Sequence, residues 1–305
     1  MSPPGFGLAL NPLHNRAYLR ADPLGGSGTM VHPPWSLMDS PREAAPMEPC
    51  RICGGGLRPA FGGIVLDTVP VHYAQCTECD SLLLPSPTWL EEAYSRHIVP
   101  DPDFGALNRS LFIHRCLRRL RSKAIGLLPK RSRTLDVGTG RGLLLRLLLD
   151  NGHDAWGYDP YPQSIFAEDR IQTSLPDGPF SAITAIEVIE HTLDPVDFLK
   201  SLRTRLAPGG FLALSTELYD SAVHGPDWVY LAPQHGQHIT LFSRRGLYRA
   251  AHAAGLEWIR SLDWDGKPFF HLLVPVDARV SRFRLWRLQR LHRAGERRHA
   301  RDGWT

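Results

Sequence analysis

Apolar residues recur with two different periods between residues 134 and 275. Short apolar runs bounded by glycine, proline or aspartate predict buried strands, whereas apolar positions spaced three and four apart predict amphipathic helices. The predicted strands span 134–138, 154–159, 170–173, 180–187, 210–216, 256–263 and 267–275. The predicted helices span 142–151, 162–168, 194–206 and 243–254. This alternation favours an α/β fold with a doubly wound, mostly parallel sheet and right-handed crossovers.

The pattern changes on both sides of this core. Residues 105–128 predict a single amphipathic helix, and a solvated role for its basic face is favoured over binding of an anionic substrate. Residues 1–47 are rich in Pro, Gly and Ser without apolar periodicity, which predicts disorder. Residues 277–305 predict an Arg-rich helix, for which a solvated role is favoured over contact with a membrane surface or nucleic acid.

Composition narrows the class of protein. Hydrophobic residues make up 43% and charged residues 22% of the chain, as in soluble globular proteins. The sequence has no run of 18 apolar residues, so a membrane span is not expected, and we predict a cytoplasmic protein. The net charge of +4 says little about a binding site, because the basic residues gather in 104–135 and 277–305 and leave the core acidic.

A glycine-rich turn stands between the first predicted strand and helix of the core. The segment 134–142 reads TLDVGTGRG, with glycines at 138, 140 and 142. Such glycines allow a tight turn and close approach of a ligand to the backbone, and the helix behind offers free N–H groups. Asp159 follows the second strand, 17 residues after the last glycine, where a carboxylate binds the hydroxyls of a ribose.

Four cysteines precede the core as two C-x-x-C pairs. They are Cys50, Cys53, Cys76 and Cys79, with 22 residues between the pairs. This spacing is typical of a zinc ribbon, in which each pair gives two thiolates to one tetrahedral ion. Disulfides or a redox pair are the alternatives, but a reducing compartment and the absence of a βαβ setting argue against them. The intervening residues predict two short strands, and Cys116 is expected to be a buried small hydrophobic residue.

Four motifs together resemble the class I S-adenosylmethionine-dependent methyltransferases, in the broad group that contains the ubiquinone-pathway and sugar enzymes. They are LDVGTGRG (135–142), GYDP (157–160), AIEVIEHTLDP (185–195) and LAPGG (206–210). The resemblance implies a Rossmann-like, seven-stranded sheet, and many such enzymes carry an N-terminal four-cysteine ribbon. It also implies that the cofactor meets Asp136, Gly138, Thr139, Gly140, Gly142, Asp159, Pro160 and Glu187. In that family Asp136 would lie near the methionine amino group and Asp159 would hold the ribose.

Two clusters are candidates for the chemistry of methyl transfer to a hydroxyl, which needs a base or a metal. Glu187, Glu190 and His191 are spaced i, i+3 and i+4, so one helical turn would bring them together. His191 is predicted to be a general base or a substrate-positioning residue, with a divalent metal at these three side chains as the alternative. His238, in the segment 234–238, is the second candidate, with His235 beside it; a structural role competes for each of these histidines.

The sequence therefore predicts a methyltransferase that uses S-adenosylmethionine, holds one structural zinc ion and acts through Glu190, His191 and His238. The acceptor is expected to be a small molecule or sugar-type compound methylated on oxygen or carbon. Alternatives are a nucleic-acid-binding zinc-ribbon protein with a degenerate core, or an enzyme acting on RNA or protein. The expected segments are a leader (1–47), the ribbon (48–88), a helical connection (89–130), the methyltransferase domain (131–276) and a basic tail (277–305).

Overall fold

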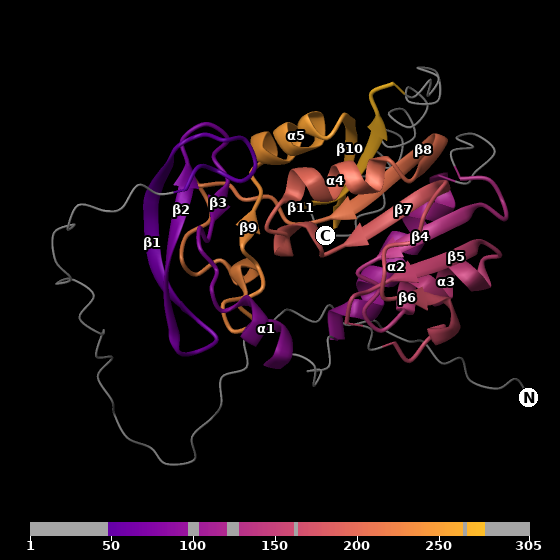
Figure 1. Cartoon of the computed structure of the whole chain (residues 1–305), viewed down its shortest axis with the longest axis horizontal. Coiled ribbons are helices and arrows are strands. Elements are labelled where there is room, and N and C mark those ends of the chain that lie inside the picture. Colours follow the sequence, from indigo (N-terminus) through magenta and orange to yellow (C-terminus); the bar gives the residue numbers. More distant parts are fainter. Residues whose placement is uncertain (1–47, 97–103, 121–127, 162–163, 265–266, 278–305) are drawn as a thin grey trace, which may run out of the picture. The chain divides into compact units, whose positions relative to one another are not determined.

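The protein is described by a computed structural model, which covers residues 48–96, 104–120, 128–161, 164–264 and 267–277 (Figure 1). The predictions of a disordered leader over 1–47 and of a helical tail over 277–305 fall outside these residues, Asp277 excepted. None of the described helices is long and apolar enough to cross a membrane.

A seven-stranded sheet forms the larger part of the described chain. Its strand order is β10-β11-β8-β7-β4-β5-β6. The strands are β4 (Arg133–Val137), β5 (Asp154–Tyr158), β6 (Ile171–Gln172), β7 (Phe180–Ile186), β8 (Leu206–Ser215), β10 (Leu256–Trp264) and β11 (Lys267–Pro275). The strands from β6 to β8 are parallel, and β11 joins β8 in antiparallel register. The predicted doubly wound sheet is therefore confirmed, and the carboxyl ends of its parallel strands lie along one edge.

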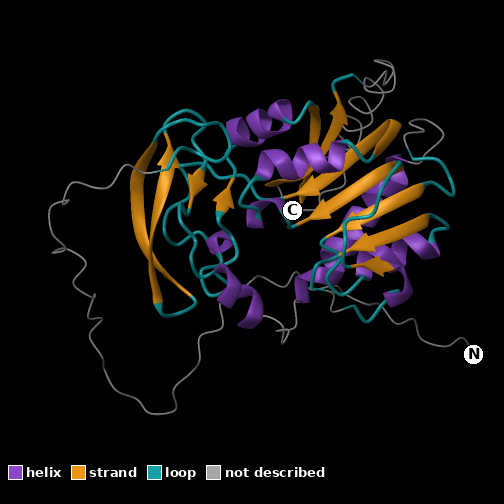
Figure 2. Cartoon of the chain, viewed as in Figure 1, coloured by secondary structure: helices purple, strands orange, loops and turns teal. Residues whose placement is uncertain are grey.

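Helices cover both faces of this sheet (Figure 2). Leu212 and Leu214 of β8 belong to a buried cluster with side chains of α4 (Pro195–Arg203) and α5 (Arg244–Ala253). Their neighbours Phe211 and Ala213 belong to a second cluster with side chains of α2 (Phe104–Leu120) and α3 (Leu143–Asp150). The period of two along a strand thus divides the apolar residues between the two helical layers.

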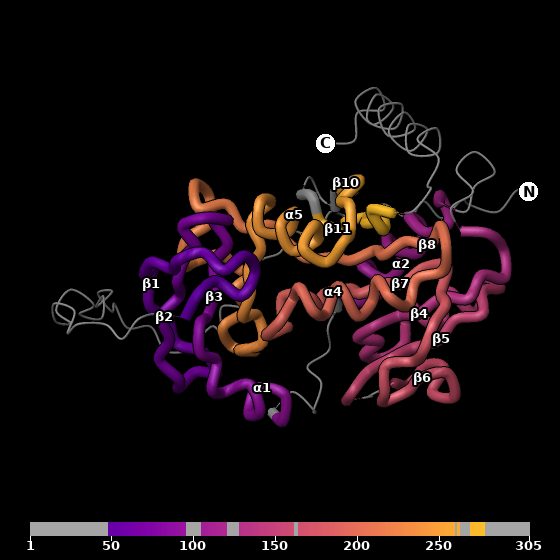
Figure 3. The backbone as a smooth tube through the Cα atoms, turned by 45° about the horizontal axis from the view of Figure 1, so that its top comes forward, coloured from indigo at the N-terminus to yellow at the C-terminus, as the bar shows by residue number. Residues whose placement is uncertain are grey.

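A second, four-stranded sheet is formed largely by the residues between and after the two cysteine pairs. Its order is β1-β2-β3-β9, formed by β1 (Leu57–Val65), β2 (Val69–Cys76), β3 (Leu82–Leu83) and β9 (Thr240–Leu241). The hairpin of β1 and β2 confirms the two strands predicted between the cysteines. Because β9 comes from a segment far along the chain, the ribbon sheet is not confined to residues 48–88. Helix α1 (Leu90–Arg96) follows it (Figure 3).

Two predicted helices differ in the structure. The helix predicted over 162–168 is absent from the described residues 164–168, where Ala167 has a φ of 61° and a short 3₁₀ turn, Glu168–Arg170, follows. The amide of Ile165 and the hydroxyl of Ser164 donate to the carbonyl of Arg141, so contact with the glycine turn overrides the local helical pattern. The helix predicted over 105–128 spans Phe104–Leu120, and residues 121–127 lie outside the description.

Candidate active site

The three glycines of the turn after β4 are required for different reasons. All have positive φ, at 70° for Gly138, 52° for Gly140 and 81° for Gly142. A Cβ at Gly138 would lie 2.4 Å from Val188 Cγ2, and one at Gly142 would lie 2.2 Å from the carbonyl oxygen of Phe166. A Cβ at Gly140 would meet no atom within 4 Å. Gly138 and Gly142 therefore pack against the protein, whereas Gly140 borders open space that a ligand can enter.

Asp136 lies at the end of β4, beneath this turn. Its side chain is 3% exposed, and the hydroxyl of Thr184 donates to Oδ1 over 2.6 Å. Burial raises the pKa of Asp136 to about 7, and the bond from Thr184 acts against that rise. The Thr139 hydroxyl donates to the Asp136 carbonyl over 3.0 Å, which fixes the turn to the strand. A buried carboxyl of this kind gains stability from a cation placed beside it.

Asp159 meets the glycine turn from the neighbouring strand. Its Oδ2 accepts from the amide of Gly140 over 2.8 Å, and its Oδ1 accepts from the amide of Tyr161 over 2.9 Å. Pro160 between them is exposed. As the sequence predicted, the Asp159 carboxylate lies against the glycine turn. The open space beside Gly140 is next to both.

The segment after β7 begins with Glu187, which has a φ of 56°. The hydroxyl of Ser215, at the end of β8, donates to Glu187 Oε1 over 2.8 Å. Burial raises the pKa of Glu187 to about 7, and the bond from Ser215 opposes this. A 3₁₀ turn, Ile189–His191, follows. Glu187 is left outside this turn, so Glu187, Glu190 and His191 do not share one helical face as the spacing predicted.

Glu190 is fully buried and hydrogen-bonded on one side only. Tyr230 donates its hydroxyl hydrogen to Glu190 Oε1 over 2.5 Å, and Thr216 Oγ1 lies 3.2 Å from the same hydroxyl. Glu190 Oε2 has no hydrogen-bond partner among the described residues. Burial, and then the charge of Glu187, raise the pKa of Glu190 well above its usual value. One buried oxygen therefore remains available to a bound group.

His191 and His238 lie beside Glu190, with ring centroids 5.0 Å apart. Burial is the main cause that lowers the pKa of His191 to about 3 and that of His238 to about 4, so both rings are neutral at pH 7. His238 Nδ1 lies 2.6 Å from the carbonyl oxygen of Tyr230. A carbonyl only accepts, so Nδ1 carries the hydrogen and Nε2 keeps a free electron pair. His191 Nε2 is buried without a partner in the described part of the chain.

Glu190, His191 and His238 form one group, in which the three candidate ligand atoms lie within 4.8 Å of one another. These are the three side chains that the sequence proposed for the chemistry. Tyr230 and Thr216, which hold Glu190, were not predicted as site residues. Tyr230 lies in a short 3₁₀ turn, Val229–Leu231, whose only signal in the sequence is its aromatic content.

The four predicted zinc ligands also converge. Cys50 Sγ lies 3.7 Å from Cys79 Sγ, and Cys53 Sγ lies 3.5 Å from Cys76 Sγ. All four sulfurs lie within 4.8 Å of one another. Zinc–thiolate bonds of about 2.3 Å place the sulfurs of a tetrahedral site roughly 3.8 Å apart, and a disulfide would need about 2.05 Å. The donor set and its spacing fit a zinc ion.

A cavity of about 1030 Å³ lies between Asp80 of the ribbon and the segments that follow β8. It is bordered by the loop 217–224, the first turns of α5 and part of β10, with Tyr219, Arg244 and Trp258 among its lining residues. None of the predicted site residues lines it. We therefore place the candidate active site at the carboxyl ends of β4, β5, β7 and β8, where ligands bind in open α/β sheets.

Comparison with known proteins gives matches to methyltransferases. The ubiquinone biosynthesis O-methyltransferase of Cereibacter sphaeroides (strain ATCC 17025) is 30% identical, over 41% of this chain and 60% of that protein. The ubiquinone biosynthesis O-methyltransferase of Xanthomonas campestris pv. campestris (strain B100) is 33% identical, over 28% of this chain and 43% of that protein. The chain thus spans less than two thirds of these relatives.

The structure also overlaps with magnesium protoporphyrin IX methyltransferase from Synechocystis, at 14% identity and a TM-score of 0.43, covering 62% of this chain and 95% of the other. The family described as "Methyltransferase domain" matches residues 109–261, which is half of the chain. With the glycine turn, the two aspartates and the strand order found together, this chain belongs to the methyltransferase domain family.

Proposed function

We propose that the protein transfers a methyl group from S-adenosylmethionine to a small-molecule acceptor. The observation that carries this proposal is the adjacency of two half-sites along one sheet edge. One half-site has the glycine turn with Asp136 and Asp159; the other has the buried Glu190 with the half-buried His191 and His238, whose candidate ligand atoms converge. A cofactor that supplies an electrophilic methyl group needs a neighbouring group that can accept a proton from the acceptor.

Several residues would hold the cofactor. The carboxylate of Asp159 and the backbone at Gly140 border the open space at the turn, which suits a ribose. Asp136 offers a buried carboxyl to the amino group of the methionine part. Glu187, at the ends of β7 and β8, would balance the sulfonium charge. The remaining residues of the two motifs, Gly138, Thr139, Gly142 and Pro160, shape the turn.

His238 is our candidate for the general base. The Tyr230 carbonyl fixes the hydrogen on Nδ1 and opposes the fall in the pKa of His238 that burial causes, so Nε2 keeps the electron pair that accepts a proton. The sequence favoured His191 as the base, but His191 Nε2 has no hydrogen-bond partner among the described residues that would orient the ring. His191 and Glu190 Oε2 would then bind and orient the acceptor hydroxyl. A divalent metal held by Glu190, His191 and His238 is the competing occupant of this group.

We further propose that Cys50, Cys53, Cys76 and Cys79 hold one structural zinc ion. Binding of nucleic acid by the ribbon is less well supported, because Ile52, beside the metal site, and Cys79, one of its ligands, belong to the buried core. Elemental analysis of protein purified without chelator should give one zinc per chain. Protein free of zinc, with four freely titratable thiols in this region, would contradict the assignment.

Activity can be tested without knowing the acceptor. Formation of S-adenosylhomocysteine from S-adenosylmethionine would be measured with a panel of small phenols, hydroxy acids, sugars and sugar nucleotides. RNA and protein would be tested as further acceptors. We expect release with at least one small molecule, and the same release with or without added Mg²⁺ or Mn²⁺ if His238 acts as a base without a metal. Release with RNA or protein alone would contradict the proposed acceptor class.

A further inference from the structure

The ribbon sheet is completed by a strand from the active-site side of the chain. In the pairing of β3 with β9, Leu82 lies opposite Leu241 and Leu83 lies opposite Thr240. Strand β9 begins two residues after His238. The ribbon therefore holds the segment that places His238, through main-chain hydrogen bonds that do not depend on which side chains are present.

Ile239 connects the two parts directly. Its amide donates to the carbonyl of Glu190 over 3.0 Å, and its carbonyl accepts from the amide of Leu84 over 3.0 Å. The side chain of Thr240 also contacts the turn, since its hydroxyl donates to the carbonyl of Thr192 over 3.4 Å. Ile239 and Thr240 are thus hydrogen-bonded on one side to the turn that carries Glu190 and His191 and to Thr192 after it. On the other side, the carbonyl of Ile239 is hydrogen-bonded to the ribbon.

Arg51 crosses this junction from inside the first cysteine pair. Its Nη2 donates to the carbonyl oxygens of Leu84 and Pro85, over 2.6 Å and 2.7 Å. Its Nη1 reaches the carbonyl oxygen of Ile239 at 3.5 Å and Thr240 Oγ1 at 3.4 Å. One planar guanidinium therefore spans the ribbon and the His238 segment with separate nitrogens. A lysine ammonium is a single point of contact and cannot reproduce this fork.

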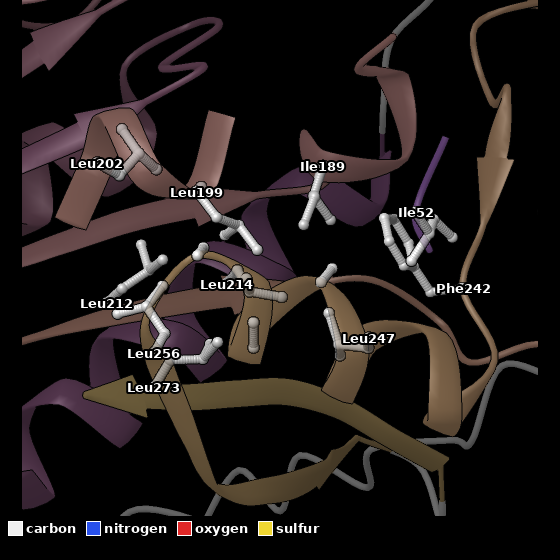
Figure 4. Close-up of a cluster of buried hydrophobic side chains, with 14 of the residues drawn as sticks. Ile52, Ile189, Leu199, Leu202, Leu212, Leu214, Phe242, Leu247, Leu256 and Leu273 are labelled. Carbon is white, nitrogen blue, oxygen red and sulfur yellow. The ribbon is translucent and has the colours of Figure 1, made fainter. Parts of the chain in front are cut away.

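The residue beside Arg51 strengthens the same junction. Ile52 is 3% exposed and belongs to the buried cluster that also contains Ile189 and Phe242 (Figure 4). Ile189 begins the turn that carries Glu190 and His191, and Phe242 directly follows β9. The two residues between Cys50 and Cys53 thus contact the active-site segments, one through hydrogen bonds and the other through apolar packing.

We propose that Arg51 is a positioning residue of the methyl-transfer site, which holds the His238 segment against the metal-binding ribbon. The proposal deepens the proposed function and rests on it for the role of His238. The ribbon then forms one side of the active site. The orientation of the His238 ring depends on the Arg51 side chain, which lies outside residues 109–261, the part matched to the family.

The test compares Arg51→Lys and Arg51→Met with Arg58→Met in the full chain. Arg58 is a matched control, because its guanidinium donates to Gln75 Oε1 within the ribbon and makes no hydrogen bond to the described residues 238–242. Three quantities would be measured: zinc content, hydrogen exchange of the peptide 236–242, and the ¹⁵N signals of His238, identified by their loss in His238→Gln. None of them requires a known acceptor.

We expect both Arg51 variants to keep their zinc and their fold. Exchange in 236–242 should be at least tenfold faster, and the His238 signals should report a mixture of tautomers in place of a single Nδ1–H form. Arg58→Met should leave both unchanged. A third variant, Arg51→Ala, leaves space for a free guanidinium ion. Adding millimolar guanidinium to this variant should slow the exchange again, which a folding defect would not show.

The proposal is overturned if Arg51→Lys retains wild-type exchange and a single tautomer. It is also overturned if that variant loses zinc, since Arg51 would then serve the fold of the cysteine pair alone. A fully active His238→Ala would refute the role of His238 in the proposed function. The exchange result on 236–242 would still decide whether Arg51 holds this segment against the ribbon.

Discussion

The two halves of the candidate site are built in different ways. The cofactor half consists of the turn 136–142 and Asp159, which belong to one βαβ unit on two neighbouring parallel strands. Thr184 of the adjacent β7 adds a single bond, to Asp136. The acceptor half consists of Glu190, His191 and His238, together with Thr216 and Tyr230, and these come from three separate segments. The first half is a local structure, whereas the second depends on tertiary packing.

The electrostatics of the two halves differ in the same sense. In the cofactor half, the Asp159 carboxylate is satisfied by two backbone amides. In the acceptor half, Glu190 Oε2 and His191 Nε2 are buried without partners among the described residues. Unsatisfied buried polar atoms are costly and mark sites where a ligand supplies the missing bond. Under the proposed function, the first half binds the cofactor and the second accepts the proton, so mutations in the two halves should have separate effects.

The largest effect is expected at His238. In His238→Ala, kcat for an acceptor found in the panel should fall about 10²–10⁴-fold, as for loss of a general base. Affinity for S-adenosylhomocysteine should stay within twofold, because His238 lies in the other half. His252→Ala, at an exposed position of α5, is the control. An equal loss of cofactor affinity would show that the halves are not separable.

The next effect concerns the fold of the cofactor half. Gly142→Ala places a Cβ against the Phe166 carbonyl at a φ of 81°, whereas Gly152→Ala has the same sign of φ, at 80°, with nothing within 4 Å. The left-handed conformation alone costs about 1 kcal/mol, so Gly152→Ala should lose about that much stability. Gly142→Ala should lose at least about 3 kcal/mol through the added clash. Denaturant unfolding of both variants measures the difference; equal losses would mean that the turn relaxes freely.

These glycines show what the sequence could predict. Gly138, Gly140 and Gly142 follow a strand at a spacing with local meaning, so the turn, the parallel sheet and the place of Asp159 beside the turn can be predicted from the sequence. The sequence also pointed to Glu190, His191 and His238. It did not predict their geometry, because Glu187 adopts a φ of 56° and leaves the helical face that the spacing predicted. Tyr230 and Arg51 carried no periodic signal, since their partners lie 40 and 188 positions away.

The third prediction separates stability from binding at Asp136. Its pKa is about 7 in the fold against an ordinary 3.8, so the carboxyl contributes stability below pH 3.8 that is lost as the pH rises through 7. Asp136→Asn cannot ionise. Without ligand at pH 8 it should be more stable than the wild type by on the order of 2–4 kcal/mol, and near pH 4 the two should be alike. Thermal unfolding at both pH values checks this.

The same variant should bind the cofactor less well, because it offers no charge to the amino group of the methionine part. A gain in stability with a loss of affinity is the usual trade at a functional site. If Asp136→Asn were destabilised at pH 8, the raised pKa would be wrong. If its affinity were unchanged, Asp136 would not face the cofactor.

The most direct measurement is a calorimetric titration of S-adenosylhomocysteine into the wild type, Asp159→Ala and His238→Ala, with Asp154→Ala as control. Asp154 is an exposed carboxylate at the other end of β5. We predict that the wild type, His238→Ala and Asp154→Ala bind equally well. Asp159→Ala should lose about 1.5–3 kcal/mol per charge-assisted hydrogen bond removed, which is at least tenfold in affinity. A wild-type protein that does not bind, or an Asp159→Ala variant that binds as tightly as the wild type, would contradict the account.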